Sequence, residues 1–311
     1  MIPRTFRIAA AVTLVALVAS ACSSSGGAAT SNPTSAATQA ASEVPASAAS
    51  AAPATPVAGG LLDKVMKAGK LVIATDADYA PQSTKKPDGT FEGFDIDVGN
   101  EIAKRLGVTA EFTAQSWDTI TAGTWSGRWD LSVGSMTITK PREAVLAFTH
   151  PYYYTPAQMS VTTKSGITSI DGLAGKTVCV GTATTYEDWL KGKLESESLG
   201  TVATPPANVT VKGLESDNNC AEAIAAGQNV GDGFLSSITV IDSSIANGTP
   251  IVKVGDPVYI EQLAASADKS GPDPSDFIVA ASKVIDDMHA DGTLTAFSMK
   301  WFKADLTKPP A

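Results

Sequence analysis

The pattern of hydrophobic and polar residues changes at residue 61, where short runs rich in β-branched side chains begin to alternate with amphipathic stretches. Strands alternating with helices are typical of α/β layers around a mostly parallel sheet. The short runs predict strands at residues 71–75, 109–113, 131–135, 159–163, 177–181, 209–212, 233–236 and 251–254.

Amphipathic stretches near both ends of this region predict helices. In the first stretch, apolar residues recur at every fourth position from Phe94 to Leu106, and Gly107 can end the helix. A later stretch has its apolar stripe within residues 277–288, and the Asp-Gly pair at 291–292 separates it from another helix. The apolar faces of these helices are expected to lie in the core.

Residues 1–60 have a different composition. Residues 1–21 combine two arginines with a short apolar stretch and end in small residues, which is typical of a secretory signal peptide. The end of this leader is similar to the bacterial lipoprotein box, in which the next residue, here Cys22, receives the lipid. Residues 22–60 are rich in Ala, Ser, Thr, Pro and Gly and predict a disordered, lipid-anchored linker. The alternative is ordinary signal cleavage with Cys22 as an incidental thiol.

Composition and charge narrow the classes of function. The 311 residues are 43% hydrophobic and 18% charged, which is enough apolar content for a folded core. The net charge of −9 and the lack of any Lys or Arg run argue against a nucleic-acid partner. The histidines, His150 and His289, match no metal-ligand spacing, so neither a metal nor a cofactor is expected.

Two cysteines remain beyond the predicted lipidation site. Cys179 and Cys220 form an even set in a chain predicted to be exported. An oxidising compartment favours pairing such residues, so a disulfide between them is expected. The alternative is two separate buried thiols.

Several sequence blocks then point to a known family. The segment at 69–81 reads GKLVIATDADYAP, and GFDID follows at 93–97. Further along come GSMTITKPRE at 134–143, FTHPYY at 148–153 and LAGKTV at 173–178. In this order, the blocks resemble those of the bacterial family 3 periplasmic-type solute-binding proteins.

The resemblance implies an α/β, two-lobed periplasmic-binding-protein-like (type II) fold with a hinge between the lobes. The first lobe would comprise residues 61–155 and 260–311, and the second lobe would comprise residues 156–259. The ligand would bind in the cleft between them, and the lobes would close on it.

Arg142 is the leading candidate for ligand binding. A planar guanidinium can hold a carboxylate through two parallel hydrogen bonds, and the resemblance implies that this Arg binds the ligand α-carboxylate. Ser135, Met136 and Thr137 lie where a strand meets the next helix, the usual ligand crevice of open α/β sheets. The alternatives are a solvated Arg before a helix and Ser and Thr residues that only cap one.

Aromatic and hydroxyl residues complete the candidate set. Tyr79 and Trp117 would form flat walls over the ligand, although Trp117 could equally belong to the core. By the resemblance, Thr184 and Thr185 face the ligand at the start of a second-lobe helix, where a Thr N-cap is the structural alternative.

One position departs from the family pattern. Amino-acid-binding members generally place an Asp for the α-ammonium near residues 232–237, where this chain has Ser236 or Ser237. A buried ammonium needs an acidic partner or several acceptors. Asp76 or Asp78 would have to compensate, or the ligand would lack a free ammonium.

These observations predict an extracytoplasmic receptor of an ABC importer, anchored to the outer face of the cell membrane through lipidated Cys22. The expected ligand is a polar amino acid or a related small carboxylate, and the expected partner is the importer permease. The receptor is expected to act as a monomer. The alternatives are a dehydratase-like enzyme on the same scaffold and a solute-sensing surface lipoprotein.

Overall fold

A computed structural model describes residues 55–309. The predicted signal peptide at 1–21, Cys22 and most of the predicted linker at 22–60 lie outside the described residues. None of the helices within 55–309 is both long and apolar enough to cross a membrane.

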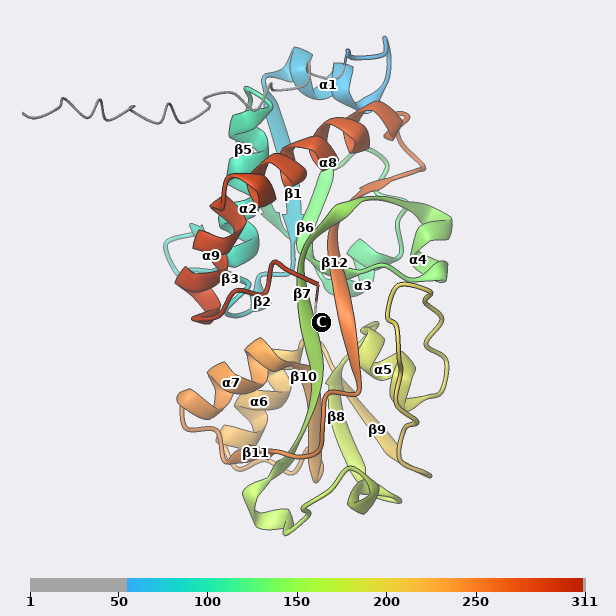
Figure 1. The fold of residues 1–311 in the computed structure, drawn as a ribbon, viewed down its shortest axis with the longest axis vertical. Helices are drawn as coiled ribbons and strands as arrows, with labels where there is room; N and C mark the ends of the chain where they lie inside the picture. Colours follow the sequence, from blue (N-terminus) through green and yellow to red (C-terminus); the bar gives the residue numbers. More distant parts are fainter. Residues whose placement is uncertain (1–54, 310–311) are drawn as a thin grey trace, which may run out of the picture. The chain divides into compact units, whose positions relative to one another are not determined.

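The first lobe is built on three parallel strands that are covered by helices (Figure 1). The strands are β1 (Lys70–Thr75), β5 (Thr109–Ala114) and β6 (Leu131–Thr137). One face is covered by α1 (Leu61–Ala68), α2 (Phe94–Arg105), α8 (Ser275–Ala290) and α9 (Thr293–Phe302). The short helices α3 (Trp117–Thr121) and α4 (Lys140–Val145) and a small sheet of β2 (Asp78–Tyr79), β3 (Ser83–Lys85) and β4 (Phe91–Glu92) complete this lobe.

The helices predicted from periodicity are confirmed. Helix α2 ends just before Gly107, which adopts a φ of 78° that an L-residue with a side chain rarely adopts. Helix α8 stops before Gly292, which has a φ of 81°, and α9 starts directly after it.

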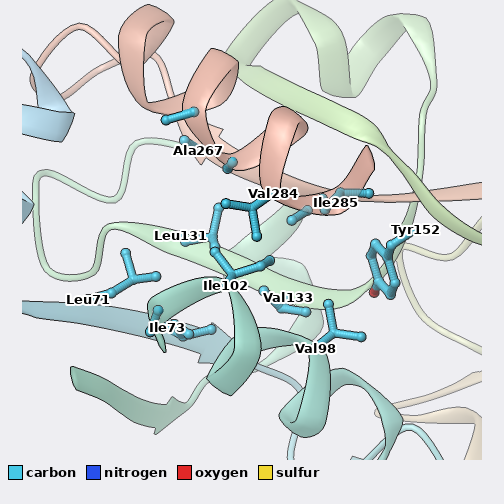
Figure 2. Close-up of a cluster of buried hydrophobic side chains, with 14 of the residues drawn as sticks. Leu71, Ile73, Val98, Ile102, Leu131, Val133, Tyr152, Ala267, Val284 and Ile285 are labelled. Carbon is cyan, nitrogen blue, oxygen red and sulfur yellow. The ribbon is translucent and has the colours of Figure 1, made fainter. Parts of the chain in front are cut away.

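Side chains of the first-lobe sheet alternate between two hydrophobic clusters. Leu71 and Ile73 of β1 pack with Ile102 of α2 on one face (Figure 2). The neighbouring Ala74 points to the other face and packs against Trp125. Fully burying a Leu or Ile side chain contributes about 1.5 to 3 kcal/mol to folding stability. These clusters therefore stabilise the strands whose carboxyl ends lie next to the site.

The second lobe repeats this plan. Its parallel strands are β8 (Thr177–Gly181), β9 (Thr210–Leu214) and β10 (Gly233–Ser237). Its helices are α5 (Thr185–Leu190), α6 (Asp217–Ala225) and α7 (Ile238–Ala246), with the short helices η1 (Thr163–Ser165) and η2 (Asp171–Leu173) and the strand β11 (Ile251–Lys253).

Two long strands connect the lobes. β7 (Leu146–Thr162) and β12 (Tyr259–Asp268) pair antiparallel, with Thr155 opposite Glu261. The predicted crossing points between the lobes, near residues 155 and 260, therefore lie beside each other. The large sheet has the order β5-β1-β6-β12-β7-β10-β8-β9, with β11 paired to β7.

This arrangement corrects two sequence predictions. The sheet is mixed rather than mostly parallel, because β12 runs antiparallel to β6 and β7, and β10 runs antiparallel to β7. All eight predicted strands are present, but β7 starts at Leu146, well before the predicted residue 159, and β12 was not predicted at all. Pro151 and Pro156 lower the strand propensity of β7. β12 contains three Ala residues together with Glu261 and Asp268, and these residue types are depleted in strands.

Candidate ligand-binding site

A cavity of about 430 Å³, counted with the part that opens to solvent, lies between the two lobes. It is lined by strand ends and helix starts, where polar groups collect in α/β sheets. Eight of the predicted ligand-binding residues line it: Asp76, Tyr79, Trp117, Ser135, Thr137, Arg142, Thr184 and Thr185.

Arg142 is buried on α4, with 7% of its surface exposed. Its Nη1 donates to the carbonyl oxygen of Thr137, and its Nη2 donates to that of Ala183, both at 2.9 Å. Within residues 55–309, these bonds leave three of the five guanidinium N–H donors for other partners. Burial lowers the pKa of Arg142, and the nearby Glu261 opposes that shift. A charged, partly unused guanidinium therefore faces the cavity.

Glu261 of β12 lines the same cavity as Arg142 and is 2% exposed. Its Oε1 accepts hydrogen bonds from the hydroxyls of Thr137 at 2.6 Å and Thr185 at 2.7 Å, and its Oε2 accepts one from Tyr186 at 2.6 Å. Burial raises the pKa of Glu261, and the three hydroxyls lower it. The hydroxyls of the predicted ligand residues Thr137 and Thr185 are thus directed at a carboxylate of the protein.

Aromatic side chains form part of the cavity lining. Trp117 lies with its ring centroid 5.4 Å from the Arg142 guanidinium carbon, and its buried Nε1 has no partner within residues 55–309. The Tyr79 hydroxyl reaches the second lobe and donates to Ser237 Oγ at 3.1 Å. Both residues predicted to form flat walls therefore line the cavity.

Ser135 is oriented by a buried network. It has a φ of 55°, and its Oγ donates to Asp95 Oδ2 at 2.8 Å and accepts from Tyr153 at 2.7 Å. The Tyr152 hydroxyl donates to Asp95 Oδ1 at 2.7 Å. Burial raises the pKa of Asp95 to about 7, against these hydrogen bonds. Asp95 therefore positions the end of β6 that carries Ser135 at the cavity wall.

Thr184 combines capping with its place in the cavity wall. Its Oγ1 accepts from the backbone N–H of Glu187 at 3.2 Å and donates to the carbonyl oxygen of Gly181 at 2.7 Å, which caps α5. Ala183, just before it, has a φ of 57°, a conformation in which an L-residue is strained. Ala183 is also the residue whose carbonyl oxygen accepts the hydrogen bond from Arg142 Nη2.

The remaining predicted residues lie outside this cavity. Ser236 is fully buried behind the wall, where its hydroxyl donates to Asp217 Oδ2 at 2.9 Å. Met136 is fully buried in the hydrophobic cluster around Trp125. Asp78 lines a neighbouring hollow, and its Oδ2 accepts from Ser216 at 2.6 Å and from Asn219 of α6 at 2.9 Å. Asp78 therefore joins the two lobes at the rim.

Asp217 was not predicted, and it lines the cavity from the first turn of α6. It is 3% exposed, and its Oδ1 accepts from the backbone N–H of Gly181 at 2.7 Å. Burial raises its pKa to about 7; the hydrogen bonds from Gly181 and Ser236 lower it, and the charges of Glu261 and Asp76 raise it. A buried carboxylate thus occupies the second-lobe wall close to Ser236.

Asp76 supplies a carboxylate from the first lobe. Burial raises its pKa to about 6; the backbone N–H of Asp78 lowers it, and the charges of Asp78 and Glu215 raise it. The acidic side chains around the cavity oppose one another's ionisation, so a positively charged group would be favoured among them. Within residues 55–309, no group of three or more His, Cys, Asp and Glu residues is arranged to hold a metal ion.

The sequence carried weak signals for the residues that were missed. Ser216 and Asp217 follow a predicted strand, a pattern that also fits simple helix capping, and Ser216 does cap α6. Glu261 lies in the segment expected to return to the first lobe, where a charged residue in a connecting strand can look solvent-exposed.

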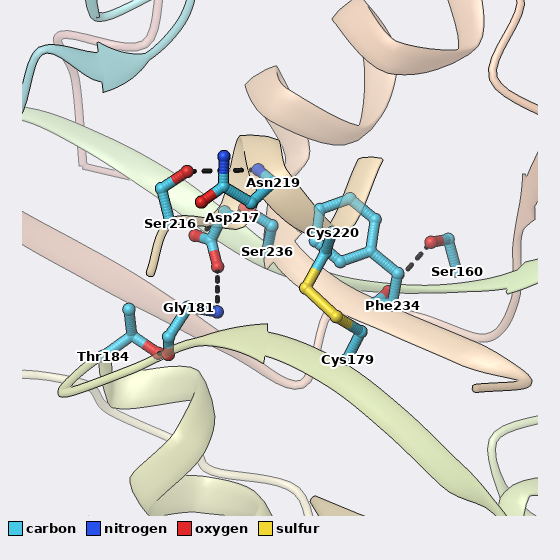
Figure 3. Close-up of a disulfide and its surroundings, with 10 residues drawn as sticks. All are labelled: Ser160, Cys179, Gly181, Thr184, Ser216, Asp217, Asn219, Cys220, Phe234 and Ser236. Atoms are coloured by element: carbon cyan, nitrogen blue, oxygen red, sulfur yellow. Dashed lines mark hydrogen bonds between the residues drawn. A yellow bond between two sulfur atoms is a disulfide. The ribbon is translucent and has the colours of Figure 1, made fainter. Parts of the chain in front are cut away.

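The predicted disulfide is present between Cys179 of β8 and Cys220 of α6, with a Cα–Cα distance of 5.9 Å (Figure 3). These are the two elements that the Gly181 to Asp217 hydrogen bond also joins. Figure 3 shows the disulfide and this hydrogen bond, both between β8 and α6. The covalent link therefore supports the wall that holds Asp217.

Known sequences are similar to this chain over most of its length. Residues 71–304 match the family described as bacterial extracellular solute-binding proteins, family 3. The L-cystine-binding protein TcyJ of Escherichia coli K12 is 31% identical over 80% of this chain and 88% of its own length. The lysine/arginine/ornithine-binding periplasmic protein of the same organism is 28% identical over 74% of this chain and 86% of its own length.

Solved structures give the same result for the fold. An ancestral arginine-binding protein bound to arginine has a TM-score of 0.64 and 27% identity, covering 75% of this chain and 98% of that chain. The ancestral amino-acid-binding protein AncCDT-1, described as a precursor of cyclohexadienyl dehydratase, has a TM-score of 0.66 and 27% identity. It covers 78% of this chain and 99% of its own.

Proposed function

This chain belongs to family 3 of the bacterial extracellular solute-binding proteins, a family of extracytoplasmic proteins. We propose that it is the receptor of an ABC importer and that its ligand is a polar amino acid or a related small carboxylate. The observation that carries this function is the Arg142 guanidinium, buried in the interlobe cavity with N–H donors to spare. A bidentate bond from that group to the ligand carboxylate would fix one end of the ligand.

The rest of the cavity suits the other parts of such a ligand. Tyr79 and Trp117 offer flat surfaces for an apolar or cationic side chain. The ligand bridges residues of both lobes, so its binding energy favours the closed arrangement. The TcyJ protein binds L-cystine, and the lysine/arginine/ornithine-binding protein binds cationic amino acids. Both names support an amino acid as the ligand.

The proposal also includes export of the chain and a lipid anchor. A signal peptide at residues 1–21, lipidation at Cys22 and a linker to residue 60 would hold a monomeric receptor near its permease. A linker of this composition would reach about 30 to 40 Å, which allows the folded part to turn toward the transporter.

Isothermal titration calorimetry tests the proposed function. The full chain should bind at least one of the proteinogenic amino acids or L-cystine, and the α-amide of that compound should bind at least about tenfold more weakly because it lacks the carboxylate that Arg142 needs. Native mass spectrometry of protein purified without denaturation identifies a bound compound by its mass. Absence of binding across the panel would contradict the proposal.

A second candidate function is a dehydratase-like enzyme. It is favoured by the buried carboxyls Asp217 and Glu261, whose raised pKa values suit a general acid, and by the similarity to AncCDT-1. Incubating the protein with prephenate-like cyclohexadienyl acids and measuring aromatic product separates an enzyme from a receptor. A solute-sensing surface lipoprotein would bind the same ligands and would be separated from a receptor by normal uptake after deletion of its gene.

A further inference from the structure

Two carboxylates of the second lobe line the cavity, Glu215 and Asp217. Glu215 is exposed to solvent, whereas Asp217 is buried and is therefore the better placed of the two for a positively charged ligand group. Asp217 lines the cavity from the start of α6, whereas Ser236 lies behind it and does not reach the cavity wall. Each Asp217 oxygen accepts one hydrogen bond, from the Gly181 N–H and the Ser236 hydroxyl, at 2.7 and 2.9 Å. A carboxylate oxygen can accept about two, so each keeps capacity for a ligand N–H.

The other carboxylates differ from Asp217 in their partners. Glu261 already receives three hydroxyl donors, and it is the acidic group with the largest effect on Arg142, so it balances the protein's own cation. Asp76 belongs to the first lobe, the same lobe as Arg142. A ligand held only by Arg142 and Asp76 would touch charges of a single lobe.

We propose that Asp217 is the residue that binds the α-ammonium of the ligand, and that the site thereby selects amino acids over carboxylic acids without an ammonium. This inference rests on the proposed function and names the second charged contact of the same cavity. The ligand carboxylate on Arg142 and its ammonium on Asp217 would then connect the two lobes. Closure requires both contacts, since a ligand shifts a conformational equilibrium only by its differential affinity for the closed state.

The surroundings of Asp217 support a fixed role. The Cys179–Cys220 disulfide joins α6 to β8 three residues after Asp217 and two residues before Gly181 (Figure 3). The carboxylate is therefore held by hydrogen bonds on both oxygens and by a covalent link between its two supporting elements. A binding group held in this way loses little conformational entropy when the ligand arrives.

Pairs of compounds that differ only in the ammonium test the inference. The pairs are L-arginine with 5-guanidinopentanoic acid, L-glutamine with glutaramic acid, and L-cystine with 3,3′-dithiodipropionic acid. For the pair whose amino acid binds, the wild type should prefer the amino acid by about 10- to 150-fold, the range for a hydrogen bond to a charged group. Calorimetry gives the ratio, and small-angle scattering should show compaction with the amino acid only.

The variant Asp217→Asn removes the charge but keeps an oxygen for the Gly181 N–H, and its amide can donate to Ser236 Oγ. It should bind both members of the pair with affinities within a few-fold of each other. Asp242→Asn makes the same change on the exposed surface of α7, where Asp242 pairs with Lys253, and should keep the wild-type ratio. Ser236→Ala keeps the charge and removes one supporting bond, so it should lower the ratio less than Asp217→Asn does.

The outcomes separate the two levels of the argument. If an amino acid binds and Asp217→Asn keeps the wild-type preference, the assignment of Asp217 is wrong while the receptor function stands. If Asp217→Asn does not fold, the test relies on the affinity ratio between amino acid and ammonium-free partner, measured for the wild type and for Ser236→Ala. Equal affinities within each pair would then overturn the inference. If no amino acid binds the wild type, the proposed function itself fails, and the inference fails with it.

Discussion

The Nη2 of Arg142, in the first lobe, donates a 2.9 Å hydrogen bond to the carbonyl oxygen of Ala183 in the second lobe. One side chain therefore contacts both lobes through the group proposed to bind ligand. Separating the lobes at this point would break the bond, so the proposed ligand binding at Arg142 would be coupled to the lobe arrangement.

The first prediction concerns this coupling. Arg142→Lys keeps the charge but loses the planar fork, so ligand binding should weaken by about 10- to 150-fold, equivalent to about 1.5 to 3 kcal/mol. Arg142→Ala should weaken it further and should also reduce the ligand-dependent compaction. Calorimetry with small-angle scattering on the same samples measures both effects. Wild-type affinity in Arg142→Ala would rule out this role.

A second prediction follows from the pKa of Asp217, which burial raises to about 7. A ligand ammonium favours the charged carboxylate, so binding near neutral pH releases a proton, and affinity falls as the pH drops below about 7. The titration of a single carboxyl can change the ligand affinity by at most about tenfold per pH unit. Calorimetry in buffers of different ionisation enthalpy measures the released proton. Asp76→Asn serves as the comparison, because burial raises the pKa of Asp76 to about 6. Only Asp217→Asn should remove the change of affinity near pH 7.

The third prediction concerns folding stability and Asp95. Burial raises its pKa to about 7, above the unfolded value of 3.8, so the folded state favours the protonated acid. Its contribution to stability is full below the unfolded pKa and is lost as the pH rises through about 7. The free energy of unfolding of the wild type minus that of Asp95→Asn should therefore be larger at pH 5 than at pH 8. Urea unfolding at both pH values measures it, and a difference that does not change with pH would contradict the prediction.

The fourth prediction is that the Cys179–Cys220 disulfide stabilises the second lobe. It closes a loop of 41 residues, and removing a native disulfide of this kind costs about 2 to 5 kcal/mol. The double variant Cys179→Ser and Cys220→Ser should lose that much in urea unfolding. Thiol titration of the unfolded, unreduced wild type should find neither of these two cysteines free.

The fifth prediction lies outside the described residues. Cys22 should be lipidated, because it follows an apolar leader and precedes a linker without a predicted fold. Metabolic labelling with a fatty-acid analogue should mark the wild type but not Cys22→Ser. Equal labelling of the two proteins would show that the lipid is not on Cys22.

Much of the fold could be read from the sequence, because the signals are local. The fourfold spacing that starts at Phe94 and the glycine at 107 define a helix through contacts between near neighbours, and the structure confirms α2. The presence of Arg142 in the cavity was predicted from the block that contains it. The disulfide was predicted from the even number of remaining cysteines and from the predicted export of the chain.

Only the tertiary structure decided which carboxylates reach the cavity. Thr137 and Glu261 are 124 residues apart in sequence, and they meet because β6 and β12 are neighbours in the sheet. Ser236 was predicted to reach the ligand, but it lies behind Asp217, because the packing of α6 against β8 and β10 determines which side chain covers the other. Local sequence sets the periodicity of each element, whereas the burial and charge of a side chain depend on elements far away in the chain, and no local pattern contains that information.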